Sequence, residues 1–375
     1  MSRRLLFLSE RYPPDWGGVA ASASRITRAL AAMGNEVDVV TWTRMLEPGR
    51  VVREEGAPAV YRMGRFRAWD MTMPHTQILL DWLAGREPYD AVWGHYLFPG
   101  GFLAVWFARL NGIPSVVSVR GNDIDRDMFP PGDFARLRWT LGEARLVAAV
   151  TQDLARKAGA LAGRDDVACL RNAVDTEVFA PGPCADRTKL GIRPDEAVLG
   201  FAGELREKKG QRHLLQALGD VQRVRPACLL IIGEVRPSEA PQGISEEQRI
   251  VITGHLAEAA EVNAHLQLCD VYLQPSLWDG MPNALLEAMA AGCGCIGSDA
   301  GGIPEIIEPG VNGMVLPRWQ LHRLGEAVLE WLDAAPEHRE RIRQAARAHM
   351  LAEFSLEGER RQLQALLERL IPSWA

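Results

Sequence analysis

Two carboxylates bracket the start of one short helical pattern, DGMPNALLEAMAAG at residues 279–292. Asp279 comes just before a glycine and Pro282, and proline suits the first turn of a helix because its missing N–H needs no partner there. Gly292 suits the position that closes the helix. Glu287 lies inside the run, beside the apolar positions that should face a core. The spacing therefore brings two acidic side chains to one end of a helix.

A single ligand would use both carboxylates. The N–H groups at a helix N-terminus attract anions, and helical side chains tilt toward that end, so Glu287 leans toward the same ligand. We expect Asp279 to hold sugar hydroxyls, the helix end a phosphate, and Glu287 a ribose. The expected phosphate-binding stretch consists of Gly280, Met281, Pro282 and Asn283. The alternative is an ordinary capped helix with a satisfied internal glutamate.

A cationic loop follows the apolar pattern AVLGFAG at residues 197–203. In the sequence GELREKKG, Arg206 and Lys209, with Lys208 beside them, stand between the end of a strand and the start of a helix. Cations beside backbone N–H groups suit a diphosphate, so both are candidates to bind a leaving group of that kind. A solvated charged loop is the alternative.

Two glycine-bearing loops complete the candidate site. RYPPDWGGVA at residues 11–20 places Gly17 and Gly18 before a helical pattern, and SDAGGIPEII at residues 298–307 carries another glycine pair. Glycine lets the backbone approach a ligand closely and aim its N–H groups at an anion. For the first pair, an ordinary tight turn explains the sequence equally well.

The elements that must position these residues alternate along the chain. Short apolar patterns typical of buried strands are separated by amphipathic helical patterns, which indicates right-handed βαβ units and parallel sheets. The strand patterns are RRLLFLS, NEVDVVTWT, DAVWGHY, PSVVSV and RLVAAVT, then AVLGFAG, ACLLIIG, RIVITG, DVYLQPS, CGCIGS and GMVLP. In such sheets ligands bind beyond the carboxyl ends of the strands, and the four candidate loops lie there.

The chain is long enough for two domains, since 375 residues exceed one ordinary core. The alternation of strands and helices breaks around residues 172–187, which indicates a linker. The sequence therefore predicts an α/β protein of two Rossmann-like, doubly wound domains that face a cleft. We place these domains at residues 1–172 and 173–350, with a C-terminal helix at 351–375 that packs back toward the first domain.

Composition excludes several classes of protein. A formal net charge of -6 gives no general attraction to nucleic acid. No stretch has the roughly 18 consecutive apolar residues of a membrane span, and the N-terminus lacks the pattern of a signal peptide. The 6 scattered cysteines are expected to be reduced thiols, and no zinc-type spacing is found. These features predict a cytoplasmic protein.

Several segments resemble the retaining GT-B glycosyltransferases of the large bacterial family 4, also called glycosyl transferases group 1. They are YPPDWGGVA, GNEVDVVT, NAVDTEVFAP, KKG, SLWDGMPNALLEAMAAG and AGGIPEIIEPGVNGMVLP, and they run through nearly the whole chain. The family's two glutamates, with seven residues between them, fall on Asp279 and Glu287. The resemblance implies contact with the donor sugar for Asp279 and with the ribose for Glu287.

The sequence departs from the family pattern at three positions. Asp279 is one methylene shorter than the usual glutamate. Glu204 stands where arginine is common, so Arg206 becomes the candidate for the missing cation beside Lys209. Arg120 stands where the family often has histidine. We expect the acceptor side at four residues, namely His95, Arg120, Asn122 and Asp123.

The resemblance implies an enzyme that moves a sugar from a UDP- or GDP-sugar to a hydroxyl group of a sugar or lipid-linked acceptor in glycan or glycolipid biosynthesis, with retention of configuration. It implies neither a metal nor another cofactor. Catalysis is expected to rest on charge stabilisation at the departing diphosphate by Lys209, Arg206 and helix N-termini. Two alternatives stay open: a GT-B nucleotide-sugar epimerase or hydrolase, and a non-catalytic subunit.

Aromatic and basic residues in the first part of the chain raise the question of a membrane surface. Seven of the 11 tryptophans lie in the first 139 residues. Arg62, Arg65 and Arg67 stand near Phe66 and Trp69. Such residues suit peripheral contact with the inner face of a membrane that holds a lipid-linked acceptor. Core tryptophans and a solvated basic strand are the alternative, which the usual burial of tryptophan favours.

Overall fold

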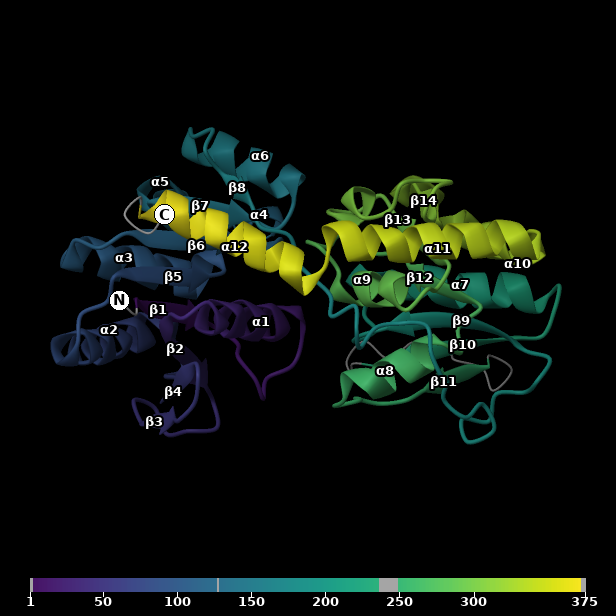
Figure 1. Cartoon of the computed structure of the whole chain (residues 1–375), viewed down its shortest axis with the longest axis horizontal. Helices are drawn as coiled ribbons and strands as arrows, with labels where there is room; N and C mark the ends of the chain where they lie inside the picture. The colour runs from purple at the N-terminus through teal and green to yellow at the C-terminus, as the bar shows by residue number, and fades with distance from the viewer. Residues whose placement is uncertain (1–2, 127, 236–248, 372–375) are drawn as a thin grey trace. The chain divides into compact units, whose positions relative to one another are not determined.

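The computed structural model describes residues 3–126, 128–235 and 249–371 (Figure 1). The chain divides into two compact units. The first runs as far as Arg171 and resumes at Arg360, and the second comprises Asn172–Glu359. Each unit contains a sheet of mainly parallel strands with helices on both faces. The predicted pair of α/β, doubly wound domains is therefore confirmed.

In the first unit, eight strands form one sheet in the order β3-β4-β2-β1-β5-β6-β7-β8. Neighbouring strands run parallel except β3 and β4. The strands are β1 Arg4–Ser9, β2 Glu36–Thr43, β3 Val51–Glu54, β4 Ala59–Gly64, β5 Ala91–His95, β6 Ser115–Val119, β7 Leu146–Ala149 and β8 Ala168–Cys169. β1 lies between β2 and β5 and is buried, as its run of large apolar residues requires.

Helices cover both faces of this sheet (Figure 1). They are α1 Gly18–Ala32, α2 Trp69–Arg86, η1 Leu97–Gly101, α3 Phe102–Asn111, α4 Asn122–Asp125, α5 Pro131–Glu143, α6 Gln152–Ala162 and α12 Leu356–Leu370. α1 and α12 pack on one face, where Phe7 and Ile26 belong to the core. α2 and α3 pack on the other face, where Leu80 and Phe107 join Leu8.

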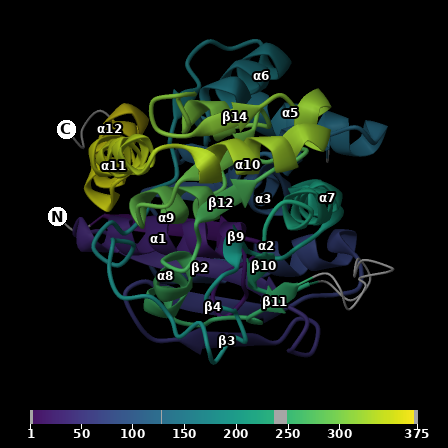
Figure 2. The same ribbon diagram turned by 90° about the vertical axis from the view of Figure 1, so that its right-hand side faces the viewer.

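The second unit is built on six parallel strands in the order β11-β10-β9-β12-β13-β14. They are β9 Ala197–Ala202, β10 Ala227–Ile232, β11 Ile250–Ile252, β12 Val271–Gln274, β13 Cys295–Ser298 and β14 Met314–Leu316. The helices are η2 Glu207–Lys209, α7 Gln211–Gln222, α8 Ala259–Leu266, α9 Asn283–Ala290, η4 Ile303–Glu305, η5 Arg318–Arg323, α10 Leu324–Asp333 and α11 Pro336–Glu353. α7 and α10 share one core with the sheet, and α9 connects β12 to β13 across its other face (Figure 2).

The chain returns to the first unit later than the sequence predicts. Residues 351–359, which the prediction gives to the returning C-terminal helix, belong to the second unit. Phe354 is buried there, and its carbonyl accepts a hydrogen bond from the N–H of Val174 at 2.8 Å. Beyond this point α12 adds Leu363 and Leu367 to the core of the first unit. The second unit thus spans residues 172–359, beside predicted limits of 173–350, and the first unit resumes at residue 360, beside a predicted return at 351.

The segment predicted as a linker, residues 172–187, packs against the second unit. Phe179 is buried, and the carbonyl of Ala180 accepts a hydrogen bond from Nδ2 of Asn263 at 2.9 Å. The N–H of Ala185 donates to the carbonyl of Ala264 at 2.8 Å. The segment lacks an apolar period because its backbone is irregular: residues 172–174 and 179 are buried, whereas 181–184 are exposed.

Candidate functional site

The loops after β9 and β12 bring opposite charges together. Lys209 ends the short turn η2 that follows β9, and Asp279 lies in the loop between β12 and α9. Nζ of Lys209 contacts Oδ2 of Asp279, and the two side chains are 21% and 13% exposed. Opposite charges that are partly shielded from water interact more strongly than charges at an open surface. Two residues that the sequence assigns to the diphosphate and to the sugar of a donor therefore lie side by side.

Two glycines allow these loops to touch. Gly210 follows Lys209 with φ +80°, and a Cβ at this position would collide with the carbonyl group of Pro275. Gly301, in the loop after β13, has φ +52°, and a Cβ there would collide with the carbonyl group of Asp279. Only glycine combines this backbone conformation with so close an approach. These two positions therefore fix how near Lys209 and Asp279 lie.

The carboxylate of Asp279 is held from several sides. Oδ1 accepts a hydrogen bond from the N–H of Gly280 at 3.0 Å. Oδ2, which contacts Lys209, also accepts one from the hydroxyl of Ser276 at 3.3 Å. Ser276 is not among the residues that the sequence predicts for the site. In the structure, Ser276 stands out as a buried hydroxyl at the carboxyl end of a central strand, directly before a candidate loop.

Helix α9 begins close to the predicted position. Pro282 is its N-cap, with an extended ψ of 115°, and not a residue of the first turn as the sequence predicts. The preceding carbonyl, that of Met281, accepts a hydrogen bond from Nδ2 of the buried Asn172 at 2.8 Å. The sequence analysis did not select Asn172 either, although its motif was recognised. Gly292 follows the helix with φ +81°, as predicted.

Glu287 lies half-buried on α9, one turn after Asn283. Its charge acts on Tyr272 of β12, beneath the helix. Burial, with smaller contributions from Cys295 and Glu287, raises the pKa of Tyr272 well above its ordinary value. Glu287 is therefore close to the sheet as well as to the helix N-terminus, and its contact with a ribose stays a prediction.

Arg206 has an acidic neighbour. Its Nη2 lies 2.7 Å from Oε2 of Glu204, and both side chains are about one-third exposed. Glu204 stands where arginine is common in the family. It thus pairs with Arg206, the cation proposed to take over the role of that arginine. To bind a diphosphate, Arg206 would have to exchange this partner, and its part in stabilising the leaving group stays a prediction.

The candidates of the first unit gather at one edge of its sheet. β1, β5 and β6 are neighbours: the loop after β1 leads to Gly17 and Gly18, His95 ends β5, and Arg120 follows β6. Gly17 has φ +106° and caps α1, which begins at Gly18. Because the carboxyl ends of adjacent parallel strands meet at one edge, these residues lie on the same side of the sheet. The position of this edge relative to the second unit, and hence the shared cleft, stays a prediction.

His95 is fully buried at the end of β5. Its Nε2 lies 2.9 Å from Oγ of Ser22 on α1. Burial, followed by the charges of Arg120 and Arg25, lowers the pKa of His95 well below its ordinary value. The imidazole is therefore neutral at physiological pH and ties the strand to the helix that follows the glycine pair. A direct contact between His95 and an acceptor stays a prediction.

Asp123 shapes the loop after β6. It is buried, and its carboxylate accepts hydrogen bonds from the N–H of Arg120 at 3.0 Å and of Gly121 at 2.8 Å. Asn122 begins the short helix α4 next to it. The backbone bonds explain why an acidic residue is needed in this loop. Acceptor contacts of Arg120, Asn122 and Asp123 stay predictions.

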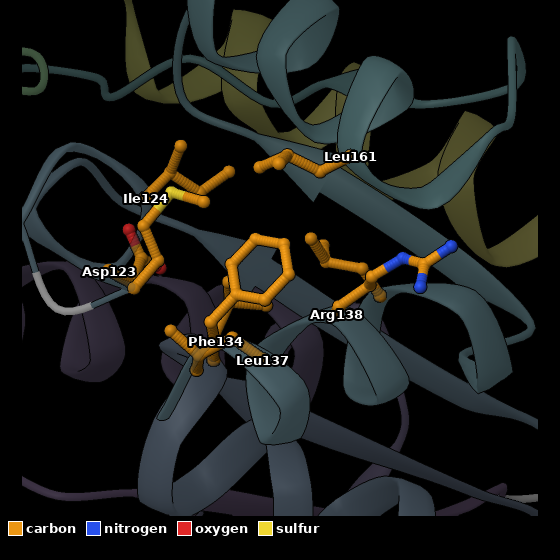
Figure 3. Close-up of a pocket in the computed structure, with 9 residues that line it drawn as sticks. Asp123, Ile124, Phe134, Leu137, Arg138 and Leu161 are labelled. Carbon is orange, nitrogen blue, oxygen red and sulfur yellow. The ribbon is translucent and has the colours of Figure 1, made fainter. Parts of the chain in front are cut away.

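A pocket lies beside this loop (Figure 3). Apolar side chains from α4, α5 and α6, such as Ile124, Phe134 and Leu161, line most of it, with Asp123 and Arg138 at its margin. Such a lining suits a hydrocarbon group better than a charged one.

A metal site needs several ligating side chains close together. Within residues 3–126, 128–235 and 249–371, no group of three or more His, Cys, Asp or Glu side chains could hold a metal ion. The cysteines are free thiols, as predicted. Asp279 is in contact with the ammonium group of Lys209, which competes with any cation for the carboxylate. Metal independence of the reaction stays a prediction.

Two family models match the chain, one over each unit. The model described as Glycosyl transferase 4-like domain covers residues 17–173. The model described as Glycosyl transferases group 1 covers residues 196–334, which include Lys209, Asp279 and Glu287. The chain belongs to the group 1 glycosyltransferases. The resemblance seen in the sequence is thereby confirmed.

Curated relatives of this glycosyltransferase share its full length or most of it. It is 27% identical over 377 residues to the GDP-mannose-dependent monoacylated alpha-(1-6)-phosphatidylinositol monomannoside mannosyltransferase of Corynebacterium glutamicum, and the match covers 96% of this chain and 97% of the relative. It is 25% identical over 315 residues to the N-acetyl-alpha-D-glucosaminyl L-malate synthase of Bacillus anthracis, over 80% of each chain. Glycosyltransferase activity in glycan or glycolipid biosynthesis is thus supported.

A solved structure with the same fold is that of Anabaena HepE in complex with UDP and glucose. The TM-score is 0.79 at 19% sequence identity, over 98% of this chain and 100% of HepE. At this identity the similarity concerns the fold alone. The glycosyltransferase therefore has the GT-B fold that the sequence predicts.

If Arg206 binds the departing diphosphate, Glu204 competes with that ligand for the guanidinium group. Arg206→Ala should then lower kcat by roughly 10²-fold, the scale for losing one charge-stabilising donor. Glu204→Gln should leave kcat at or above the wild-type value, because it releases Arg206. Steady-state kinetics would measure both variants, with Lys208→Ala as the control. Near-wild-type rates for Arg206→Ala and Lys208→Ala alike would show that Arg206 is a surface residue without a part in the reaction.

Proposed function

We propose that this glycosyltransferase moves a sugar from a UDP- or GDP-sugar to a hydroxyl group of a glycan or glycolipid acceptor, with retention of configuration. The half-buried pair of Lys209 and Asp279 beside the N-terminus of α9 carries the proposal. One member is a cation for a phosphate, and the other is an acceptor for sugar hydroxyls. A nucleotide sugar holds these two groups next to each other. Support also comes from the relatives, since one is named as GDP-mannose-dependent and HepE binds UDP.

In the proposed reaction, the bond between the anomeric carbon and the phosphate oxygen breaks, and the oxygen keeps the electron pair. Lys209 stabilises the developing charge, together with the N–H groups at the start of α9. Arg206 assists after exchanging Glu204 for the diphosphate. Asp279 accepts hydrogen bonds from the sugar hydroxyls, and Glu287 from the ribose.

The acceptor attacks from the face that the diphosphate leaves. A bond forms between the acceptor oxygen and the anomeric carbon, and the hydroxyl proton passes to the departing phosphate oxygen. Retaining glycosidases instead form a covalent intermediate on a carboxylate. We assign Asp279 no such role, because the hydroxyl of Ser276 and the N–H of Gly280 engage both of its oxygens. The groups proposed to lie near the reacting molecules in the first unit are Gly17, Gly18, His95, Arg120, Asn122 and Asp123.

An epimerase or hydrolase would use the same donor chemistry, and a non-catalytic subunit would use none of it. The relatives named above are a transferase and a synthase, which does not favour either alternative. Product analysis with and without an acceptor separates these functions. Release of free sugar at one rate in both conditions would contradict transfer.

We further propose a lipid-linked acceptor and peripheral contact of the first unit with the inner face of the membrane. In the part of the chain that the structure describes, no helix is long and apolar enough to cross a membrane. Two neighbouring helices expose large apolar side chains: Ile78 and Trp82 on α2, and Trp106 and Leu110 on α3. Tryptophan is typical of membrane interfaces. The Corynebacterium relative, by its name, acts on a phosphatidylinositol mannoside.

Of the three arginines that the sequence predicts for a membrane surface, Arg62 and Arg65 are engaged in ion pairs and Arg67 is exposed. Arg62 pairs with Glu54. Arg65 pairs with Glu10 and lies over the ring of Trp69 at 4.9 Å. Trp42 and Trp93 belong to the core, as the alternative interpretation of the tryptophans expects. The membrane proposal therefore rests on α2 and α3 instead.

The membrane proposal predicts the behaviour of one double variant. Wild-type protein should sediment with phosphatidylglycerol vesicles, and Trp82→Ala combined with Trp106→Ala should lower the bound fraction several-fold, because interfacial binding scales with the apolar area inserted. Trp319→Ala removes a 74% exposed tryptophan from the second unit and should bind as the wild type does. Absence of wild-type sedimentation, or equal loss in the control, would contradict the proposed surface.

Metal independence predicts that EDTA leaves the rate of transfer largely unchanged. Lys209 and the helix N-terminus would supply the charge that a divalent cation supplies in metal-dependent transferases. The measurement is the initial rate before and after chelation. Loss of activity that Mg²⁺ or Mn²⁺ restores would refute this account of the leaving group.

The roles assigned to the two carboxylates predict different kinetic defects. Asp279→Asn should lower kcat by roughly 10²-fold or more, because it removes a charged acceptor at the reacting sugar. Glu287→Gln should chiefly weaken binding of the nucleotide, since a ribose diol prefers a charged acceptor. Glu337→Gln, an exposed carboxylate on α11, is the control. Near-wild-type kinetics and nucleotide affinity in both test variants would remove the basis for the site.

A further inference from the structure

Strand β12 and its extension carry polar side chains on one face. Tyr272, Gln274 and Ser276 alternate along the chain with Val271 and Leu273, which lie in the core shared with α7 and α10. The three polar residues are at most 1% exposed. A buried polar group costs free energy unless it is hydrogen-bonded, and apolar residues would fill the same space without that requirement. This polar stripe therefore needs a reason other than packing.

Hydrogen bonds join the three side chains in one direction. The hydroxyl of Tyr272 donates to Oε1 of Gln274 at 2.8 Å, and Nε2 of Gln274 donates to Oγ of Ser276 at 2.9 Å. The hydroxyl of Ser276 then donates to Oδ2 of Asp279 at 3.3 Å. Burial raises the pKa of Tyr272 well above its ordinary value, so the phenol keeps its proton. Because Ser276 accepts from the amide, its single proton is directed to the carboxylate.

The last hydrogen bond gains importance from Lys209, which contacts the same oxygen of Asp279. Under the proposed function, on which this inference rests, Lys209 turns to the diphosphate when the donor binds. Asp279 then loses its ionic partner but keeps the hydroxyl of Ser276 and the N–H of Gly280. Ser276 is itself fixed from the neighbouring strand, because Oγ of Ser298 donates to its carbonyl at 2.6 Å.

We infer that Tyr272, Gln274 and Ser276 are positioning residues, which hold the carboxylate of Asp279 in place for the donor sugar while Lys209 binds the diphosphate. They act through Asp279 and touch no substrate. Each hydrogen bond limits the rotation of the next side chain. The fixed conformation of the buried strand therefore restrains the carboxylate of Asp279 in the loop. These hydrogen bonds orient a group that binds the sugar, and not one that binds the nucleotide. Their loss should therefore slow transfer without weakening the binding of a nucleoside diphosphate alone.

Three variants break the chain of hydrogen bonds at successive links. Ser276→Ala should lower kcat by roughly 10-fold or more, Gln274→Leu by less, and Tyr272→Phe least, because misplacement of the carboxylate diminishes with distance from the broken link. The affinities for UDP and for GDP, measured by isothermal titration calorimetry, should equal those of the wild type. Leu273→Val shortens a buried side chain on the opposite face of the same strand, and it should lower the melting temperature without changing kcat.

A purely structural role of the stripe gives another result. The three variants would then resemble Leu273→Val, with lower melting temperatures and unchanged kcat, or would lose nucleotide affinity in parallel with kcat. Either outcome overturns the inference. Tyr272→Phe keeps the shape of the ring and gives a result even where Ser276→Ala does not fold. Wild-type protein that transfers no sugar would overturn the proposed function together with this inference, whereas wild-type transfer with full kcat in all three variants overturns the inference alone.

Discussion

Close backbone contact at Gly210 and Gly301 is the constraint on which the site of the second unit depends. β9 and β12 are neighbours in the sheet, so the loops after them emerge at one edge. Neighbouring strands alone would still leave room for side chains between the loops. With glycine at both positions, the loop after β9 lies against Pro275 and the loop after β13 lies against Asp279. Charged residues 70 positions apart in the sequence meet as a consequence.

Polar groups buried beneath the loops keep them in place. In the second unit Asn172 binds the carbonyl of Met281, and in the first unit Asp123 binds the N–H groups of Arg120 and Gly121. Buried polar groups with satisfied bonds rigidify a structure, because breaking one leaves an unpaired group in a medium of low dielectric constant. The loop before α9 and the loop after β6 are therefore held by buried side chains. Ligand-binding groups on such loops begin near the geometry that binding requires.

The sequence predicts those parts of the fold in which the residue pattern is compatible with only one type of secondary structure. Runs such as ACLLII are apolar on both faces and form central parallel strands. α2 has no such pattern, since it presents apolar residues to both sides: Leu79 and Leu83 are buried, whereas Ile78 and Trp82 are exposed. No single helical face can be read from such a segment.

The candidate site shows the same division between local and long-range information. The N-terminus of α9 and the closing Gly292 follow from residues adjacent in sequence. The pairing of Lys209 with Asp279 and the bond from Asn172 to Met281 depend on how loops meet in space. Polar residues alternate with apolar ones at Tyr272, Gln274 and Ser276, and this alternation can be read in the sequence. In so short a segment, however, the sequence does not show whether the polar face is buried.

The pairing of Lys209 with Asp279 has a consequence for selectivity under the proposed function. Each charge satisfies the other while no donor is bound, so a ligand must separate them and replace both partners. A nucleotide sugar offers a diphosphate to Lys209 and hydroxyl groups to Asp279. A free sugar replaces the partner of Asp279 alone and leaves the ammonium group of Lys209 half-buried without an opposite charge, which costs free energy. A site of this kind favours the complete donor over the free sugar by more than the added contacts alone, because the free sugar incurs a penalty that the donor avoids.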